Sequence, residues 1–395
     1  FIPERSTCPT NVYRPSRDRH QPLKRAGNLE LFLHGGKAPA WLTVRMKKLS
    51  SVILTMIVEE YGQEKLLVNL SDPLWFQALS CVLAYDWDSS GSTTVTCGVL
   101  KDVLSSMDLG MKAVGGKGRR SRRTQDELAS ATSELDLDGS ALERLRYSSR
   151  MCAKVDSTAI QAGYQLYHHT MFVIDSEKWA VVQQGMNPSF KTARRYHWLS
   201  EDVRSFVEEP HKGIVGQRVH ERVLDMTSKG SGESRRICTD LASEDPERIR
   251  RQVASIRPLG QDTLGRWLES TKGHGIVSAY AIVRESQVNW GALEEAYKIR
   301  PTNYEELLAI RGLGPSTARA LALVAEIAYG AETSWRDPVK FSFAFGGKDG
   351  IPFPVKRATM DKSISLLKEA IEEAKLGRED KLQMIRRLRS FTERT

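Results

Sequence analysis

The sequence predicts an α+β protein in which a mixed N-terminal and central part, containing a β-hairpin, precedes an all-helical domain. Two observations predict this arrangement. Residues 164–174 and 179–186 are dense in aromatic and β-branched side chains and flank the polar turn Asp175-Ser176-Glu177-Lys178, as in a β-hairpin. Residues 303–330 instead carry apolar side chains at helical spacing on both sides of Gly312-Leu313-Gly314, which predicts two helices joined by a glycine turn.

The chain of 395 residues is long enough for two or three domains with their own cores. Its first residues are rich in Arg, Pro and Ser and lack periodic apolar side chains, so we expect them to be disordered. The predicted segments are a disordered basic leader (1–25), a mostly helical N-terminal part (26–110), a basic flexible loop (111–127), a central α+β part with the β-hairpin at 164–186 (128–257), an all-helical domain with the glycine turn (258–357) and C-terminal helices (358–395).

In the N-terminal part we expect a short strand at 29–33 and an amphipathic helix from Trp41 to Tyr61. A second helix is predicted to begin within 71–76. Ser71 or Asp72 is a natural N-cap there, and Pro73 suits the first turn of a helix. Helices and loops alternate in this part without a clear sheet.

The charge of the chain favours a polyanionic partner. The net charge is +9 and the isoelectric point is about 9.2, a modest excess for this length. Six basic side chains and no acidic one are concentrated between Lys112 and Arg123. Three glycines in this run predict a flexible, solvated loop, and such a loop can also follow a phosphate backbone.

The cysteine spacing argues against a protein held together by zinc or disulfides, and the hydropathy argues against a membrane-spanning protein. Five cysteines are widely spaced with no C-x-x-C pair, which indicates neither a zinc site nor a disulfide framework. No apolar stretch is long enough to cross a bilayer. We therefore expect a cytoplasmic protein without a membrane partner.

The glycine turn is a candidate site for a nucleic-acid backbone. Leu313 is expected to fill the space between the two helices, and Pro315 suits the first turn of the second helix. The backbone N–H groups from Gly314 to Thr317 would then face outward at a helix N-terminus, where an anion is favoured. This pattern resembles the helix-hairpin-helix motif of DNA repair and replication proteins; the alternative is an ordinary helix pair. The candidate DNA-binding residues are Gly312, Leu313, Gly314, Pro315, Ser316, Thr317 and Arg319 in the turn, and Lys117, Arg119, Arg120, Arg122 and Arg123 in the basic run.

The β-hairpin is a candidate active site because it carries polar side chains in the middle of both strands. A four-residue turn would place Ile174 opposite Trp179 and His169 opposite Gln184. Since side chains alternate across a strand, His169 and Gln184 would share one face, and His168 would lie on the other with Gln183. Buried polar groups need partners, so we expect that both faces are partly wet or that one face lines a cleft.

Phosphodiester cleavage requires a base, an acid and cations or a metal ion, and such groups surround the hairpin. The candidate catalytic residues are Asp156, His168, His169, Gln184, Arg195 and His197. Asp156 and His169 are candidate ligands of a divalent metal, Mg²⁺ or Mn²⁺, and Asp86 is a further one in its own loop. No nucleotide or organic cofactor is indicated. Glu208-Glu209-Pro210-His211 can add acid and base groups, although the sequence does not place it. The alternative is a packed aromatic cluster whose imidazoles bond to backbone carbonyls.

Several long sequence words resemble a known family. They include LHGGKAP, LSDPLWFQAL, GYQLYHH, WAVVQQGMN and IRGLGPSTARALALVAEIAYG. These words are similar to those of the prokaryotic family named domain of unknown function 763, over a stretch from Lys24 to the C-terminus. The resemblance implies a C-terminal half with a helix-hairpin-helix motif and implies no established activity.

Taken together, the residues predict a DNA-binding protein that contacts the backbone without sequence specificity. The favoured function is a metal-dependent nuclease or a related DNA-processing enzyme. The alternatives are a non-catalytic DNA-binding or architectural protein and an RNA-binding or RNA-processing protein, since Tyr164, Tyr167, Tyr196 and Trp198 can stack on unpaired bases. A homodimer is possible.

Overall fold

The computed structural model of the protein describes residues 40–83, 90–216, 219–255 and 285–339, together with residues 365, 367, 368, 372, 382, 385 and 386. The predicted leader, the predicted strand at 29–33 and Asp86 lie outside these residues. The described residues near the C-terminus are helical, and Leu367 is buried in the core that the N-terminal helices form.

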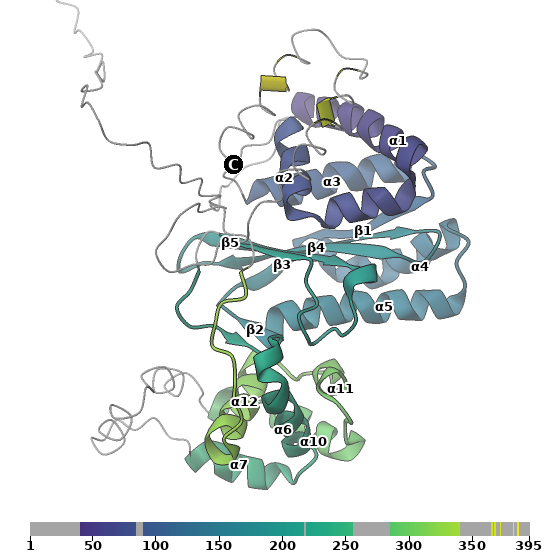
Figure 1. Ribbon diagram of the computed structural model, residues 1–395. Helices are drawn as coiled ribbons and strands as arrows, with labels where there is room; N and C mark the ends of the chain where they lie inside the picture. The colour runs from purple at the N-terminus through teal and green to yellow at the C-terminus, as the bar shows by residue number, and fades with distance from the viewer. Residues whose placement is uncertain are drawn as a thin grey trace, which may run out of the picture.

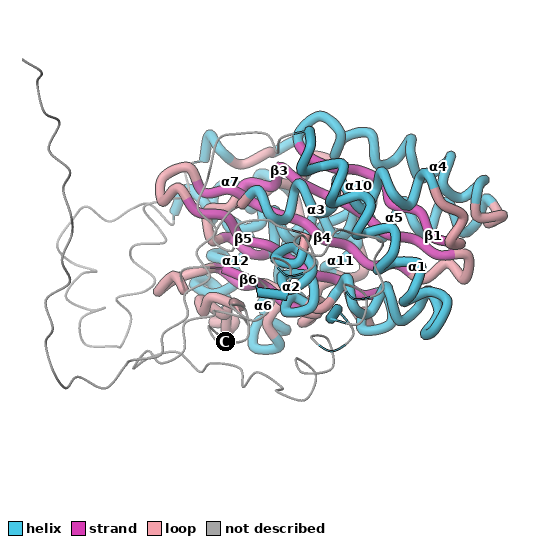
Figure 2. Tube along the Cα trace, turned by 90° about the horizontal axis from the view of Figure 1, so that it is seen from above, coloured by secondary structure: helices cyan, strands magenta, loops and turns pink. Residues whose placement is uncertain are grey.

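A five-stranded antiparallel sheet with the order β1-β3-β4-β5-β6 lies at the centre of the molecule (Figures 1 and 2). Its strands are β1 (Met111–Lys117), β3 (Gln165–Ile174), β4 (Trp179–Asn187), β5 (Thr192–Leu199) and β6 (Gly213–Gly216). The predicted hairpin is confirmed as β3 and β4. Both faces of this sheet are covered by helices, so polar side chains on either face are buried within the protein.

The predicted register of the hairpin is wrong by one residue. Val173 pairs with Trp179, His169 pairs with Gln183, and His168 pairs with Gln184. The turn contains three residues instead of four, because the N–H of Ile174 donates to the carbonyl of Lys178 and Glu177 adopts a left-handed conformation with φ of 64°. The shift reverses the predicted grouping: His169 shares a face with Gln183, and His168 shares a face with Gln184.

The predicted flexible loop at 111–127 is also wrong. Its first part is the edge strand β1, which pairs along its whole length with β3. Its second part is the 3₁₀ helix η1 (Gly118–Arg123), which leads directly into α4 (Thr124–Glu134). Gly115 has φ of 89°, and a Cβ at this position would lie 2.2 Å from the carbonyl oxygen of His169. This glycine therefore permits close strand packing, which sequence alone does not distinguish from flexibility.

Three N-terminal helices cover one face of the sheet (Figure 1). They are α1 (Ala40–Ser71), α2 (Pro73–Val82) and α3 (Gly91–Ser106). Helix α1 extends ten residues beyond the predicted end at Tyr61 and is kinked at Gly62, where φ is 82°. The predicted start of the next helix is confirmed, since the carboxylate of Asp72 accepts hydrogen bonds from the N–H groups of Leu74 and Trp75 at 2.7 and 2.9 Å.

The opposite face is covered by α4 and α5 (Gly139–Lys154), followed by a layer of further helices (Figure 1). That layer consists of α6 (Gly232–Ala242), α7 (Pro246–Ser255), α10 (Trp290–Ile299), α11 (Tyr304–Ala309) and α12 (Pro315–Tyr329). Two helices that the sequence places in the central part, α6 and α7, pack with α10 and α12. One buried core runs from the sheet through α5 into this layer, so the C-terminal helices are packed directly against the central part.

Shorter elements connect these layers. The π-helical turn η2 (Val155–Ala159) extends α5 and leads into β2 (Ile160–Gln161), which pairs with β7 (Leu224–Asp225). The remaining short helices are η3 (Ser200–Asp202), η4 (Lys229–Ser231) and η5 (Glu285–Gln287). Among the helices that the structure describes, none is both long and apolar enough to cross a membrane.

Candidate functional site

A chain of hydrogen bonds is buried between the sheet and α5. Ser149 Oγ lies 2.9 Å from Nε2 of His169, and Nδ1 of His169 lies 2.8 Å from Oε1 of Gln183. The amide nitrogen of Gln183 donates to Oδ2 of Asp156 at 2.5 Å. The carboxylate of Asp156 only accepts hydrogen bonds, so the NH₂ group of the Gln183 amide must face it and the amide oxygen must face His169. That oxygen needs a donor, so the imidazole proton lies on Nδ1 of His169. Nε2 of His169 is then the acceptor for the hydroxyl of Ser149.

Asp156 is the centre of this chain and lies in η2. It also accepts a hydrogen bond from Nε1 of Trp198 at 3.1 Å, and its Oδ1 lies 2.5 Å from Nε2 of His211. Burial raises the pKa of Asp156, and the nearby His211 opposes that shift. The sequence identified the Glu208–His211 stretch as a source of acid and base groups but could not place it. The fold brings His211 onto Asp156 from a loop 55 residues away.

The other predicted catalytic residues lie on the opposite face of the sheet, against α2 and α3. Gln184 bonds to Thr93 and Tyr167, and the guanidinium of Arg195 donates to Gln77 at 3.1 Å and stacks on Phe76 at 4.8 Å. His168 and His197 are buried on the same face. The sheet separates Asp156 and His169 from His168, Gln184, Arg195 and His197, so the six candidate catalytic residues form two groups on opposite faces.

The groups on this second face are deeply desolvated. Burial lowers the pKa of His168 to about 3, lowers that of His197 well below its usual value, and lowers that of Arg195 to about 10. Each imidazole is thus held neutral at pH 7. These residues have the surroundings of core polar groups. Nε2 of His168 lies 3.0 Å from the hydroxyl of Thr170, whereas the alternative that the sequence left open expected the imidazoles to bond to backbone carbonyls.

The predicted metal ligands do not fit a shared ion. The amide of Gln183 lies between Asp156 and His169, and both ring nitrogens of His169 already have partners. Among the described residues, no group of three His, Cys, Asp or Glu side chains is arranged to hold a metal ion. Asp86, the third predicted ligand, is not among the residues that the structure describes.

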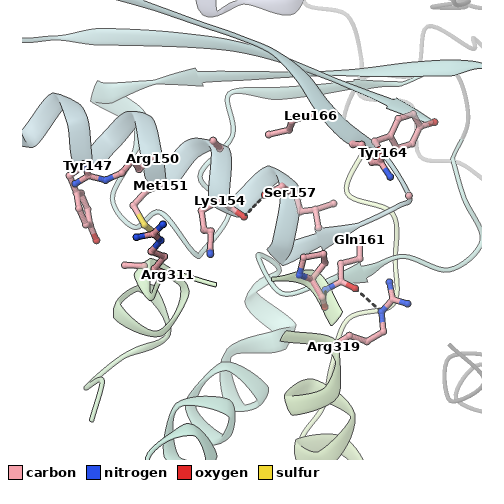
Figure 3. A pocket seen from close by; sticks show the side chains of 16 residues that line it. Tyr147, Arg150, Met151, Lys154, Ser157, Gln161, Tyr164, Leu166, Arg311 and Arg319 are labelled. Carbon is pink, nitrogen blue, oxygen red and sulfur yellow. Dashed lines mark hydrogen bonds between the residues drawn. The ribbon is translucent and has the colours of Figure 1, made fainter. Parts of the chain in front are cut away.

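A large cleft lies between α5 and the turn that joins α11 to α12 (Figure 3). Its volume is about 990 Å³. Side chains of α5 and η2 form one wall, and the turn forms the other. Four cationic side chains surround it, Arg150, Lys154, Arg311 and Arg319, and none of the 16 described residues that line it carries a carboxylate. The rest of the lining is mainly apolar and aromatic: Tyr147, Met151, Ala153, Ile160, Tyr164, Leu166, Ala309 and Pro315.

Two of the cations are partly buried without a compensating acid. Nζ of Lys154 donates to the carbonyl of Ile310 at 3.3 Å, and Nε of Arg319 donates to Oε1 of Gln161 at 2.6 Å. Desolvation lowers the pKa of both Lys154 and Arg319, and no carboxylate raises either one. A desolvated cation without a counterion is stabilised by a bound anion, so the electrostatics of the cleft favour a negatively charged ligand.

The turn itself has most of the predicted geometry. Gly312 has φ of 87°, Leu313 is fully buried between the helices, and Pro315 is the first residue of α12. Gly314 is extended, so only the first of the two glycines uses a left-handed conformation. The first backbone hydrogen bond of α12 runs from the N–H of Ala318 to the carbonyl of Gly314. The N–H groups of Ser316 and Thr317 precede that bond and belong to the first turn of the helix, which has no carbonyl partners within the helix.

Neighbouring side chains hold this turn in place. The amide of Asn289 donates to the carbonyl of Gly312, and Oγ1 of Thr317 accepts from the backbone N–H of Asn289, both at 3.0 Å. The amide of Gln161 donates to the carbonyl of Pro315 at 2.8 Å. Thr317 is thus buried and structural, whereas Gly312, Pro315 and Arg311 are exposed.

The predicted basic run lies beside the same surface. Lys117, Arg119, Arg120, Arg122 and Arg123 are all exposed, and the ion pairs found within the described part of the chain involve none of them. A smaller cavity of about 180 Å³ lies next to η1 and reaches Ser149 and His169. Its lining shares Arg150, Ala153 and Leu166 with the large cleft. The two segments predicted to bind DNA, more than 180 residues apart, therefore border one continuous surface.

Two comparisons with known proteins found no match, and a third found a family. A family model described as a protein of unknown function, DUF763, matches residues 27–355. The chain belongs to this family. No curated protein and no solved structure matches it. The matched range includes the sheet, α5, the basic run and the glycine turn, so every wall of the cleft is part of the DUF763 region.

Sequence reasoning did not select Arg150 or Arg311, which complete the cleft of this DUF763 protein. One signal was present: Arg150 and Lys154 lie four residues apart on a helix and so share a face. This pair did not by itself indicate a binding site, because exposed basic side chains on one face of a helix are common. Its position opposite Arg311 follows only from the packing of α11 on α5.

Proposed function

We propose that this protein binds the phosphate backbone of DNA in the cleft between α5 and the α11–α12 turn, and that η1 extends the contact. One observation carries the proposal: the cleft has four cations and no lining carboxylate among the described residues. Surface cations of folded proteins commonly lie near acids, as Arg236 lies 3.0 Å from Asp240. A cluster of cations without acids on the wall of a cleft matches a polyanionic ligand.

The turn supports the same ligand. It brings the first N–H groups of α12 next to Pro315, which lines the cleft, and a helix N-terminus favours an anion. The combination of an exposed Gly312, a buried Leu313 and a short preceding helix is consistent with a helix-hairpin-helix motif. Such a motif contacts phosphate and reads no base, so we expect binding without sequence specificity.

Binding is tested by fluorescence anisotropy with labelled oligonucleotides at several salt concentrations. Each phosphate contact contributes a slope of about −0.7 to −0.9 to log K against log salt. We expect Arg311→Ala to weaken binding about 10-fold and to reduce the slope by about one contact. Arg311 is exposed, so its replacement leaves the fold intact.

Arg236→Ala is the matched control, because it removes an exposed cation of α6 that does not line the cleft. A loss of affinity equal for both variants would contradict the cleft as the binding site. RNA of matched sequence is included as a second ligand, and tighter binding to RNA than to DNA would identify RNA as the partner.

Phosphodiester cleavage is the second candidate function, and the contact between Ser149 and His169 favours it. Both residues line the smaller cavity, which shares Arg150 with the cleft. Burial lowers the pKa of His169, which keeps the imidazole neutral and also makes it a weaker base than a solvated histidine. In this candidate the Ser149 oxygen bonds to phosphorus, its proton passes through His169 to the departing deoxyribose oxygen, and water then hydrolyses the phosphoserine ester.

Cleavage is tested on labelled DNA with Mg²⁺, Mn²⁺ or a chelator, since the predicted metal-dependent nuclease remains a proposal. A strand covalently attached to the protein is expected to accumulate when hydrolysis is slow. Ser149→Ala is expected to abolish both the cleaved DNA and the strand attached to the protein. Anisotropy is expected to show unchanged DNA binding by this variant. Cleavage that persists in Ser149→Ala would assign the activity elsewhere.

A further inference from the structure

We infer that the cleft takes an unpaired nucleobase, so that the DNA it prefers is single-stranded. This inference rests on the proposed function and specifies its ligand. Contacts to phosphate groups would account for the four cations. They would not account for the apolar and aromatic side chains that line the cleft together with those cations. A site for backbone only would be lined by charged and polar groups, whereas eight of the 16 residues that line this cleft are apolar or aromatic.

The size of the cleft matches one or a few nucleotides. A volume of 990 Å³ lies at the top of the range of about 300–1,000 Å³ that accommodates small organic ligands. A base pair inside a duplex cannot enter a pocket of this kind, because its bases are stacked and paired. A base from a single strand enters without the free-energy cost of unpairing and unstacking that a duplex requires.

The apolar side chains of the cleft suit the base of a nucleotide, and its cationic side chains suit the phosphate. Met151, Ile160 and Leu166 are apolar residues of the lining, and the cations lie on α5, on the turn and in α12. Figure 3 shows Arg150 and Lys154 across from Arg311. A base would occupy the interior while its phosphates contact Arg150 and Arg311, which are exposed. Stacking or apolar contact stabilises any bound base, in agreement with binding that reads no sequence.

The two tyrosines that line the cleft, Tyr147 and Tyr164, are each held in place by contacts within the protein. The hydroxyl of Tyr147 donates to Glu305 at 2.6 Å, and its ring packs edge-on against Phe206. The ring of Tyr164 is held by a cation contact with Arg194 at 4.6 Å. A surface fixed in this way loses little conformational entropy when a base packs on it.

The test compares three labelled DNA ligands by anisotropy at one salt concentration: a single strand, the same strand with consecutive abasic sites, and the duplex. We expect the intact single strand to bind at least 10-fold more tightly than either of the others. Equal affinity for the single strand and its abasic form would overturn the inference and leave backbone binding standing. Absence of binding to all three would instead reject the proposed function.

A variant that fills the cleft tests the location. Ala309 lines the cleft and is exposed, so Ala309→Trp occupies the cleft without disturbing the core. We expect this variant to lose the preference for the intact strand over the abasic strand, because the indole occupies the space of the base. Ala309→Ser is the matched control and should retain the preference. If Ala309→Trp also retains it, the base lies elsewhere and the inference fails.

Discussion

Arg194 and Asp337 form an ion pair at 2.6 Å in which neither side chain is exposed to solvent. Arg194 belongs to the central strand pair β4–β5, whereas Asp337 lies in the segment that follows α12. The same carboxylate also accepts the backbone N–H of His220 at 2.8 Å. This ion pair therefore joins the segment after α12 to the sheet, although its two residues lie 143 positions apart in the sequence.

We predict that Asp337→Ala lowers the free energy of unfolding by about 3–5 kcal/mol, because it leaves the buried guanidinium without a counterion. The measurement is urea unfolding followed by circular dichroism. Asp240→Ala, which breaks the exposed pair with Arg236, should cost less than about 1 kcal/mol. Similar losses in the two variants would show that burial does not distinguish the pairs.

Gln183→Met should destabilise the protein by about 1–3 kcal/mol, because it leaves Nδ1 of His169 without its partner and removes one of the two hydrogen bonds that Oδ2 of Asp156 accepts. Gln165→Met on the exposed end of the same sheet is the control and should be nearly neutral. Nitrogen NMR of the His169 ring is expected to show the proton on Nδ1 in the unmodified protein. A proton on Nε2 would contradict the hydrogen-bond directions derived for this chain.

Stability should fall as the pH is lowered from about 6.5. Burial depresses the pKa of His168 to about 3, and burial lowers the pKa of His169 and of His197 as well. Below the unfolded value of about 6.5 the unfolded chain binds protons that the native state does not, so each histidine favours unfolding with a slope of up to about 1.4 kcal/mol per pH unit.

This dependence is measured as the urea midpoint at pH 7.5, 6.5 and 5.5. His168→Asn removes one of the three titrating groups and should flatten the curve below pH 6.5. A midpoint that is constant over this range, or a dependence unchanged in His168→Asn, would show that these imidazoles are not held neutral by the fold.

Gly115→Ala should be strongly destabilising. The left-handed backbone at this position costs about 1–3 kcal/mol for a residue with a Cβ, and the added carbon would also meet the His169 carbonyl at 2.2 Å. Gly139→Ala is the control, because α5 begins there and a Cβ would meet no atom within 4 Å. Thermal unfolding compares the two. A tolerated Gly115→Ala would support the flexible loop that the sequence predicted.

The sequence by itself determined the elements whose cause is local. The hairpin at 164–186, the cap at Asp72, the turn at Gly312 and the start of α12 at Pro315 each follow from residues that are neighbours in the chain. Turn chemistry, capping and periodicity act over a few residues, and the sequence displays them directly. The family followed from long sequence words for the same reason.

Only the tertiary structure decided where those elements meet. A single residue in the 175–178 turn exchanged the partners of the two histidines, so that His169 shares a face with Gln183 and His168 shares a face with Gln184. Helices on both faces of the sheet bury both polar groups. Packing of α11 on α5 created the cleft by bringing Arg311 opposite Arg150 and Lys154, which lie far from it in the chain. Such juxtapositions depend on long-range burial of apolar surface, which the order of residues does not display.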